Sequence, residues 1–220
     1  MKPQHLAEMW HIQPDILEYL DEFTPPETGL MRKIRDHAHA MDKEHWLISP
    51  EVARFFQLLA RMKGAKRIYE FGSFLGYSGI AWSAALSEGG EVVLTELDPS
   101  YFELMTNYIA RSPNPERVTC RCVDAHEDIT AEGLFDIILI DHDKPRYPEA
   151  WLLAKKHVAE NGLILIDDIL WRGRVSSHKY IDDPSTKGVR VLNEMVRDDP
   201  EMTSLMVPIG DGVCLAMRTQ

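Results

Sequence analysis

Acidic residues stand at the ends of five successive apolar runs in this chain. Each run is short, as expected of a parallel strand that is buried on both faces. Because parallel strands share one carboxyl edge, the carboxylates that close them should gather at one site. A single acid at a strand end is commonly a helix cap or a solvated turn, but five on one edge indicate a ligand site. The acids are Glu70, Glu96, Asp124, Asp141 and the pair Asp167-Asp168.

The first of these acids leads into a glycine turn within the segment KRIYEFGSFLGYS, residues 66–78. Gly72 and Gly76 separate an apolar run from a helical pattern, which predicts a strand, a turn and a helix start. Glycine admits a positive φ and the close approach of a ligand, and the helix N-terminus offers free N–H groups. A dinucleotide-binding turn needs a further glycine where Phe74 stands, and no P-loop lysine follows Gly76. An acid at this turn would repel a pyrophosphate, so Glu70 suits a ligand with an ammonium group.

A second group of polar residues lies in two later segments, Asp-His-Asp-Lys at 141–144 and Ile-Asp-Asp-Ile-Leu-Trp-Arg-Gly at 166–173. The strands that precede them are expected neighbours, so Asp141 can converge with Asp167 and Asp168. An all-oxygen set without Cys or a His pair selects a hard divalent ion, Mg²⁺ first, with Mn²⁺ or Ca²⁺ as alternatives. The competing interpretation is two helix-capping acids and one salt-bridged Asp.

These motifs resemble those of the cation-dependent S-adenosylmethionine (SAM) O-methyltransferases of the catechol and caffeoyl-CoA type. The resemblance rests on E-x-G-S-x-x-G-Y-S from Glu70, on D-x-D-K-x-x-Y from Asp141, and on D-D-I-L-W-R-G from Asp167, and it covers about residues 47–217. The family usually has Asn where this chain has Asp168. Asp adds a third negative charge and cannot donate a hydrogen bond when ionised.

The resemblance implies how SAM is held. Ser78 and the backbone of Gly72 would bind the methionine portion, with Ser73 beside them. Glu96 can accept both hydrogen bonds of a ribose diol, and its alternative role is a turn acid before Asp98. Asp124 and Ala125 would lie at the adenine. The expected SAM-binding residues are therefore Glu70, Gly72, Ser73, Ser78, Glu96, Asp124, Ala125, Asp141 and His142.

The implied reaction is methyl transfer from the SAM sulfonium to a hydroxyl oxygen. A metal at Asp141, Asp167 and Asp168 would bind two neighbouring substrate oxygens and lower the pKa of the attacking one. Lys144 would be the catalytic base, because the adjacent cation disfavours its ammonium form. Asp143 acts in the opposite direction, and a salt bridge from it to Lys144 is the alternative. An aromatic acceptor could pack against Trp46, Trp171 and Tyr147.

The order of the predicted elements gives a doubly wound α/β fold. Two late runs flank Ile209-Gly210-Asp211-Gly212, a hairpin signal. The fold class is therefore a mostly parallel, seven-stranded, Rossmann-like methyltransferase sheet with a C-terminal antiparallel hairpin, as in the family. Strands are expected at 66–71, 91–96, 117–123, 134–140, 162–166, 203–208 and 213–218.

Helices are predicted before the first strand, at 14–23, at 27–42 and after Ser49, which precedes Pro50 as an N-cap. The third helix should bury Val52, Phe55, Phe56, Leu59 and Met62, and another helix is expected near 186–198. Residues 1–220 are expected to form a single SAM-dependent methyltransferase domain, with an N-terminal helical cap (1–64) and an α/β core (65–220).

Composition narrows the class of protein. The 220 residues are 45% hydrophobic and 27% charged, which is ordinary for a soluble globular protein. A net charge of −11 argues against a broad nucleic-acid footprint, so the late basic residues are interpreted as a solvated loop. No apolar run reaches the ~20 residues of a membrane span, and no signal-peptide core begins the chain, so no membrane partner and a cytoplasmic location are expected. The three cysteines are interpreted as reduced core thiols. The late basic residues are Arg172, Arg174, Lys179, Lys187 and Arg190.

The sequence thus predicts a SAM-dependent, divalent-metal-dependent O-methyltransferase whose partner is a small hydroxylated acceptor, catechol-like, phenolic or a natural product. Alternatives are O-methylation of a CoA ester or of a modified tRNA uridine, and a SAM-binding protein without catalysis. A nicotinamide dehydrogenase is disfavoured by Phe74 and by the terminal hairpin. A homodimer is an open alternative, since the family often forms dimers.

Overall fold

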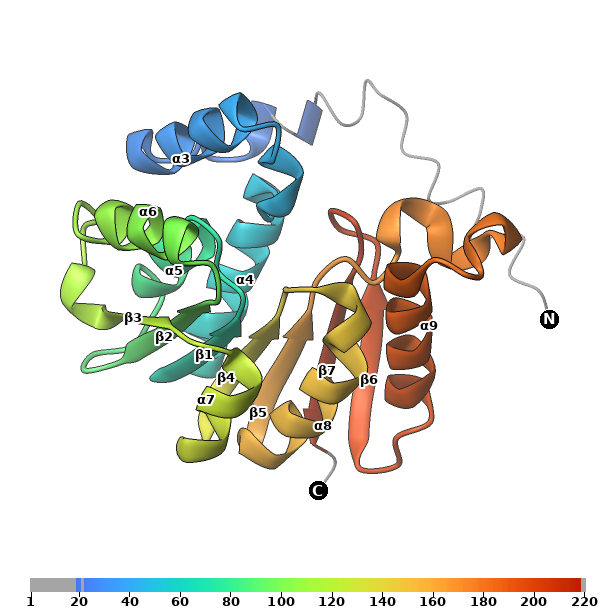
Figure 1. Ribbon diagram of the computed structural model, residues 1–220. Helices are drawn as coiled ribbons and strands as arrows, with labels where there is room; N and C mark the ends of the chain where they lie inside the picture. Colours follow the sequence, from blue (N-terminus) through green and yellow to red (C-terminus); the bar gives the residue numbers. More distant parts are fainter. Residues whose placement is uncertain (1–18, 21, 219–220) are drawn as a thin grey trace.

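The computed structural model describes residues 19–20 and 22–218 and contains one seven-stranded sheet (Figure 1). The strand order is β3-β2-β1-β4-β5-β7-β6. Strands β1 to β5 pair in parallel, whereas β7 runs antiparallel to both β5 and β6. The predicted fold class, including the closing hairpin, is therefore confirmed. The strands are β1 Arg67–Phe71, β2 Glu91–Glu96, β3 Val118–Cys122, β4 Phe135–Ile140, β5 Val158–Ile166, β6 Met202–Val207 and β7 Val213–Arg218.

Helices cover both faces of this sheet and form two separate hydrophobic cores with it (Figure 1). The first face is covered by α3 Gly29–Ala40, α4 Pro50–Lys63, α5 Tyr77–Ser83 and α6 Pro99–Ile109. The second face is covered by α7 Ala125–Asp128, α8 Tyr147–His157 and α9 Pro184–Arg197. Short 3₁₀ turns connect these elements: η1 Glu44–Trp46, η2 Pro115–Arg117, η3 Ile129–Ala131, η4 Lys144–Arg146, η5 Trp171–Ser176 and η6 His178–Tyr180.

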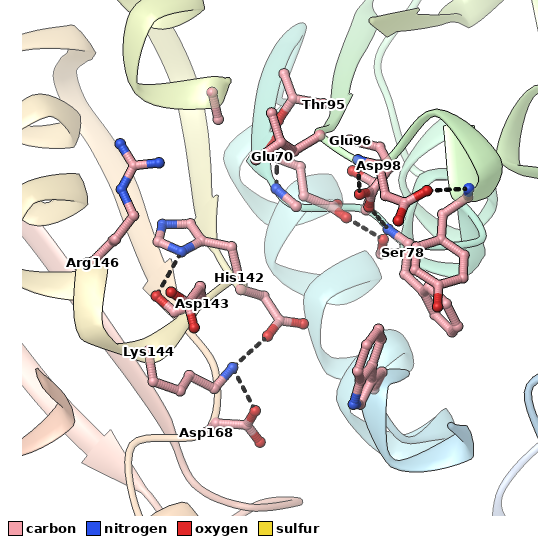
Figure 2. A pocket seen from close by; sticks show the side chains of 18 of the residues that line it. Glu70, Ser78, Thr95, Glu96, Asp98, His142, Asp143, Lys144, Arg146 and Asp168 are labelled. Carbon is pink, nitrogen blue, oxygen red and sulfur yellow. Dashed lines mark hydrogen bonds and ion pairs between the residues drawn. The ribbon is translucent and has the colours of Figure 1, made fainter. Parts of the chain in front are cut away.

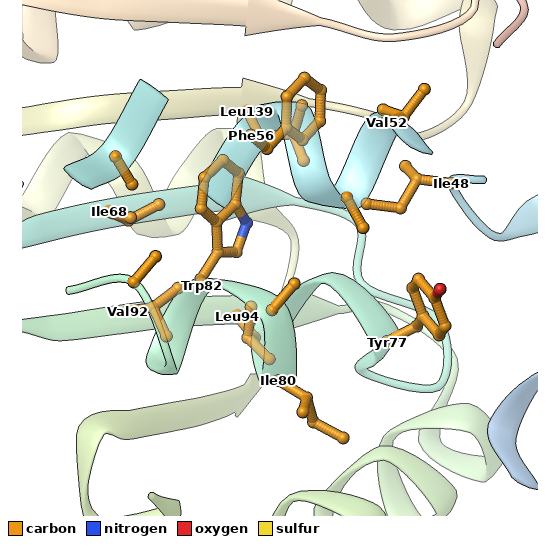
Figure 3. Close-up of a cluster of buried hydrophobic side chains, with 14 of the residues drawn as sticks. Ile48, Val52, Phe56, Ile68, Tyr77, Ile80, Trp82, Val92, Leu94 and Leu139 are labelled. Atoms are coloured by element: carbon orange, nitrogen blue, oxygen red, sulfur yellow. The ribbon is translucent and has the colours of Figure 1, made fainter. Parts of the chain in front are cut away.

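The predicted helix after Ser49 is α4, and it packs directly on the sheet. Ser49 caps it, with its hydroxyl accepting from the N–H of Val52 at 3.4 Å. Phe56 stacks on Trp82 of α5 with ring centres 5.3 Å apart (Figure 3). Helix α4 therefore belongs to the first helical layer. The burial predicted for Met62 is wrong, because 83% of that residue is exposed.

The second face holds the segment that follows β4. Gly188 of α9 lies so close to η4 that a Cβ there would stand 2.2 Å from the carbonyl oxygen of Lys144. Tyr147, at the start of α8, is completely buried in the same core. The chain from Lys144 to Tyr147 is thus held from two sides, which fixes the side chains that it presents to the sheet edge.

Other predictions differ from the structure in detail. Strand β5 begins at Val158, four residues before the predicted start, and Asn161 adopts a positive φ of 57° within it. The cysteines are all free, but Cys122 is exposed, so its interpretation as a core thiol is wrong. Of the predicted helix 14–23, residues 14–18 and 21 lie outside the described residues. No helix in the described part of the chain is long and apolar enough to span a membrane.

Candidate active site

A cavity of about 920 Å³ opens at the carboxyl edge of the sheet. It lies where the strand order reverses between β1 and β4, which is the usual position of a ligand site in an open α/β sheet. Figure 2 shows side chains from both sides of this point facing one space. The predicted site residues that line the cavity are Glu70, Gly72, Ser73, Ser78, Glu96, Asp124, Ala125, Asp141, His142, Lys144 and Asp168; Asp167 is buried beside it.

Glu70 is held by two donors from α5. Its Oε1 accepts from Ser78 Oγ at 2.5 Å, and its Oε2 accepts from Trp82 Nε1 at 2.8 Å. The residue is only 2% exposed. Burial raises the pKa of Glu70 to about 7, although the two hydrogen bonds act to lower it. The side chain is therefore poised between its charged and neutral forms near neutral pH.

The glycine turn brings the ends of β1 and β4 together. Gly72 has a φ of +77°, and a Cβ there would stand 2.8 Å from both the carbonyl oxygen of Asp141 and Cβ of His142. A side chain at position 72 would therefore clash with the end of β4, and the positive φ there also favours glycine. Ser73 is buried, and its hydroxyl has no hydrogen-bond partner among the described residues. That hydroxyl lines the cavity close enough to Glu70 to contribute to lowering the pKa of that acid.

Glu96, at the end of β2, is fixed by backbone groups. Its Oε2 accepts from the N–H of Phe74 and its Oε1 from the N–H of Asp98, both at 2.9 Å. Burial raises the pKa of Glu96, and these backbone hydrogen bonds oppose the shift. The alternative prediction of a turn acid is correct for one oxygen, which bonds the N–H of Asp98. The carboxylate nevertheless faces the cavity (Figure 2).

Asp124 caps α7 and is also paired with a cation. Its Oδ1 accepts from the N–H of His126 at 2.9 Å, and its Oδ2 accepts from Arg146 at 2.8 Å. Burial acts to raise the pKa of Asp124, but the Arg146 guanidinium outweighs it and the net shift is downward. Asp124 and Ala125 therefore line the cavity at the start of α7, where the charged Asp124 is paired with Arg146.

His142 is a neutral residue of the site. Its Nδ1 lies 3.0 Å from the carbonyl oxygen of Asp143, and its buried Nε2 has no partner among the described residues. Burial lowers the pKa of His142 to about 3, and the nearby ring of His126 contributes to the same shift. The ring packs edge-on against Tyr147 and His126. It can therefore supply a neutral nitrogen to a ligand.

Lys144 joins two of the three clustered acids. Its Nζ lies 3.1 Å from Asp141 Oδ1 and 2.7 Å from Asp168 Oδ2, and it donates to Tyr147 Oη at 2.8 Å (Figure 2). The alternative salt bridge from Lys144 to Asp143 is therefore wrong, since Asp143 is exposed and is not among its partners. Burial lowers the pKa of Lys144, but the neighbouring phenol and the two carboxylates outweigh it. Its pKa lies well above the usual value.

The three acids repel one another. Burial raises the pKa of Asp141, the charge of Lys144 lowers it and the charge of Asp168 raises it. The net effect is a pKa of about 6. Burial first, and then the charges of Asp141 and Asp168, raise the pKa of Asp167 well above the usual value. The buried Oδ1 of Asp167 has no hydrogen-bond partner within the described residues. A buried carboxylate oxygen without a partner, close to two further carboxylates, is a candidate ligand atom for a divalent cation.

The described residues do not already form a finished metal site. Among them, no three His, Cys, Asp or Glu side chains are arranged to hold an ion together. The ammonium of Lys144 bridges two of the expected ligands, Asp141 and Asp168. The family's usual Asn carries no charge, so the ion pair between Lys144 and Asp168 is particular to the departure at that position.

Two tryptophans form apolar walls of the cavity. Trp46 packs edge-on against Phe74 and Tyr101, and Trp171 lines the cavity beside Lys144. The role predicted for Tyr147 as a wall is wrong, because this residue is completely buried and does not line the cavity.

Several residues that shape the site carry no motif in the sequence. Trp82 belongs to an apolar helical pattern, yet its indole N–H holds Glu70. Thr95 donates to the carbonyl oxygen of Glu70 at 2.7 Å and accepts from the N–H of Gly72 at 3.4 Å. Arg146 pairs with Asp124 across 22 residues of chain. Only the polar Thr95 inside a buried strand offered a signal, since a buried hydroxyl needs a partner.

Comparison with known proteins agrees with this site. The O-methyltransferase family profile matches residues 21–219. The chain is 31% identical to a catechol O-methyltransferase from Niastella koreensis, over 99% of each chain. It is 29% identical to the caffeoyl-CoA O-methyltransferase of Eucalyptus gunnii, over 95% of this chain and 90% of the relative.

Solved structures lead to the same class. An O-methyltransferase from Bacillus cereus in complex with SAH has a TM-score of 0.80 and 27% identity, over 92% of this chain and 96% of that one. The O-methyltransferase TomG from Streptomyces achromogenes, in complex with SAM, has a TM-score of 0.80 and 26% identity, over 92% and 95%.

The fold and the cavity define a Rossmann-like, SAM-dependent methyltransferase. The chain belongs to the O-methyltransferase family. Within that family it is a SAM-dependent O-methyltransferase of the caffeoyl-CoA and catechol type.

Proposed function

We propose that this protein methylates one of two neighbouring hydroxyl groups on a small catechol-like, phenolic or natural-product acceptor, with a divalent cation. The observation that carries the proposal is the position of the acid cluster. Asp141, Lys144 and Asp168 line the same cavity as the cofactor acids Glu70 and Glu96. A methyl donor on the acids of β1 and β2 would therefore face an acceptor at the ends of β4 and β5, as methyl transfer requires.

In the proposed SAM site, each of the polar groups described above binds a different part of the cofactor. Glu70 meets the ammonium group of SAM, and the hydroxyl of Ser73 and the N–H groups of the turn meet its carboxylate. Glu96 accepts from the ribose hydroxyls. Asp124 and Ala125 border the adenine, where the ion pair with Arg146 closes the end of the cavity.

A divalent cation would be held by Asp141, Asp167 and Asp168. When bound, it would orient two neighbouring acceptor oxygens and lower the pKa of the one that attacks the methyl group. The ligand types fit Mg²⁺, with Mn²⁺ or Ca²⁺ as alternatives. The partnerless Oδ1 of Asp167 supports this assignment.

Lys144 is the proposed proton acceptor for the attacking hydroxyl. In the described arrangement its pKa is raised, which keeps the ammonium charged. The carboxylates of Asp141 and Asp168 stabilise the ammonium form and would be neutralised by a bound divalent cation. The pKa of Lys144 would then fall toward the range of a base. Its position, fixed by Tyr147 and by the contact with α9, then aims the amine into the cavity.

The same proposal keeps two broader predictions. The chain acts as a single methyltransferase domain and works in the cytoplasm, with a homodimer as the open alternative to a monomer. Methylation of a CoA ester, the reaction named for the Eucalyptus gunnii relative, is the second candidate, because Arg172 and Arg174 line the acceptor half of the cavity and could meet a charged substituent.

The test is a calorimetric titration of the metal-stripped protein. Micromolar SAM binding is expected without metal, and catechol should bind the SAH complex only when Mg²⁺ is added. Phenol, which lacks the second hydroxyl, is the matched control and should bind at least tenfold more weakly.

Two results would change the proposal. Catechol binding that is equal with and without Mg²⁺ would remove the metal from it. SAM binding with no metal-dependent binding of any diol would favour a different acceptor or a SAM-binding protein without catalysis.

A further inference from the structure

Trp171, the aromatic wall beside Lys144, lies close to two cations. The ring centre of Trp171 is 5.5 Å from Lys144 Nζ and 5.7 Å from Arg174 Cζ. The ammonium of Lys144 is already paired with carboxylates, whereas the guanidinium of Arg174 is not. Trp171 is therefore close both to the acid cluster, which suits hydroxyl groups, and to a basic residue, which marks a basic end of the cavity.

Arg174 has unused hydrogen-bonding capacity. Within residues 19–20 and 22–218, no residue forms a hydrogen bond or an ion pair with its guanidinium, which instead lies over the rings of Trp171 and Tyr180. Its charge acts on Asp183. Hydrogen bonds from Thr186 lower the pKa of Asp183, and the charge of Arg174 adds to that shift. A planar guanidinium with free N–H donors beside a cavity is well suited to an anionic group.

The neighbouring basic residues are used differently. Arg190 donates to the carbonyl oxygens of Val175 and Ser177, both at 2.8 Å, and so holds the chain around Arg174 in place. Lys187 is exposed on α9 and does not line the cavity. The interpretation of these residues as a solvated loop holds for the exposed Arg172 and Lys187, but Arg172 and the partly exposed Arg174 also line the cavity.

The turn that carries both arginines is fixed from outside. Trp171, Arg172 and Gly173 all have positive φ values, of 47°, 53° and 74°. Such values are unfavourable for residues with a Cβ and persist only when the surroundings hold them. The carboxylate of Asp211 provides that hold, because both of its oxygens accept from the N–H of Arg172, at 2.7 and 2.8 Å. The basic end of the cavity is thus preorganised.

We propose that the acceptor carries an anionic substituent, a carboxylate or a phosphate, that binds Arg174 with Arg172 beside it while its hydroxyls lie at the acid cluster. The acceptor ring then packs against Trp171. The proposal rests on the proposed function and adds the charge of the substrate. Asp168, Asp183 and Asp211 are the acids near this end. Asp168 pairs with Lys144, Asp183 caps a helix and Asp211 accepts from a backbone N–H, which leaves the arginine side chains as the groups available to an anion.

The test compares two ligands of nearly the same shape, of which one carries a negative charge and the other none. 3,4-Dihydroxybenzoate and 3,4-dihydroxybenzamide are titrated into the SAH-bound protein with Mg²⁺. The acid is expected to bind about tenfold more tightly than the amide, a preference that 0.5 M NaCl should reduce. 3,4-Dihydroxyphenylphosphonate separates the two anions, since the preferred one will bind more tightly.

Substitutions of basic residues test which residue causes the preference for the acid over the amide. Arg174→Gln should bring the acid and the amide to within about twofold of each other, and Arg174→Lys should restore part of the difference. Lys187→Gln removes the same charge from α9 outside the cavity and should keep the full preference. An unchanged affinity for SAH will show that each variant is folded.

The outcomes separate the two proposals. Equal affinity for acid and amide in the unaltered protein, or a preference that Arg174→Gln leaves intact, overturns the anionic acceptor and leaves the diol chemistry standing. If SAH binds and neither diol does, the proposed function fails at its acceptor, and the anionic substituent falls with it.

Discussion

The two halves of the cavity are built in different ways. In the cofactor half, the acids of β1 and β2 accept from Ser78, Trp82 and backbone N–H groups, so their positions are set by regular elements. In the acceptor half, Lys144 pairs with two acids from different loops, and the turn at Arg172 depends on the distant Asp211. The cofactor half is held locally, whereas the acceptor half is held by contacts between separate segments.

This difference matches the demands on each half. A cofactor site must bind one unchanging molecule, and local hydrogen bonds on a strand and a helix fix it with little dependence on the rest of the chain. An acceptor site set by loops can change its lining without disturbing the sheet. We therefore expect substitutions in the two halves to have separable effects on SAM affinity and on turnover.

The largest separation is expected from Asp141→Ala. This change removes a partner of Lys144 and one of the three clustered acids, so kcat/KM should fall by at least about 10³-fold. The affinity for SAM, measured by calorimetry, should change less than about threefold. Asp143→Ala is the control, since this exposed neighbour is not a partner of Lys144. A comparable loss in both variants would mean that the local backbone, and not the carboxylate, matters.

Gly72→Ala is expected to damage both halves, because Gly72 is where they touch. The new Cβ would stand 2.8 Å from the backbone of Asp141, at a φ of +77°. We expect a loss of about 2–4 kcal/mol in the free energy of unfolding, measured by denaturant titration. Gly173→Ala has a similar φ of +74° and nothing within 4 Å, so it should cost only about 1 kcal/mol. Equal losses would show that the strand ends are not in tight contact.

Trp82→Phe should weaken the cofactor half alone. It removes the indole donor of the buried Glu70, and we expect SAM affinity to fall about tenfold, or about 1–2 kcal/mol. The KM for the acceptor should hold within about twofold at saturating SAM. Phe56→Leu is the control, because it disturbs the same stack but leaves the donor in place. If Phe56→Leu weakens SAM binding as much, packing and not the hydrogen bond positions Glu70.

The smallest expected effect is a pH dependence of SAM binding. Burial raises the pKa of Glu70 to about 7, so its carboxylate is charged above pH 7 and neutral below it. SAM carries an ammonium group, and its affinity should therefore fall by up to about tenfold per pH unit below 7. Glu70→Gln should flatten the profile. Since the pKa of Asp141 is about 6, a slope that persists in this variant would assign the titration to Asp141 instead.

The sequence predicts most of the cofactor half because its signals are local. Strand β2 begins and ends at the predicted residues, and the acids of β1 and β2 line the cavity as expected. Each of these inferences needs only the alternation of apolar residues, a glycine turn and the rule that parallel strands share one edge. The wrong burial of Met62 is an error of the same local kind, since the helical face was assigned one turn too far.

The acceptor half is less accessible to sequence reasoning because it depends on contacts between distant residues. Lys144 reaches Asp168 across 24 residues of chain, and no local pattern separates that partner from the adjacent Asp143. The complete burial of Tyr147 follows from the packing of α8, which a motif cannot reveal. In the sequence, Arg174 is one of several cations in a late segment. Its position beside Trp171 depends on the fold of that segment.

The hold of Asp211 on Arg172 has a consequence for the order in which the molecule assembles. The ribosome makes Asp211 about forty residues after Arg172, when the strands of the cofactor half have already emerged. The N–H of Arg172 therefore gains this acceptor only when the segment between β6 and β7 has been made and the hairpin has joined the sheet. Nascent chains should therefore acquire a SAM site first, and only the last hairpin makes them competent to choose an acceptor.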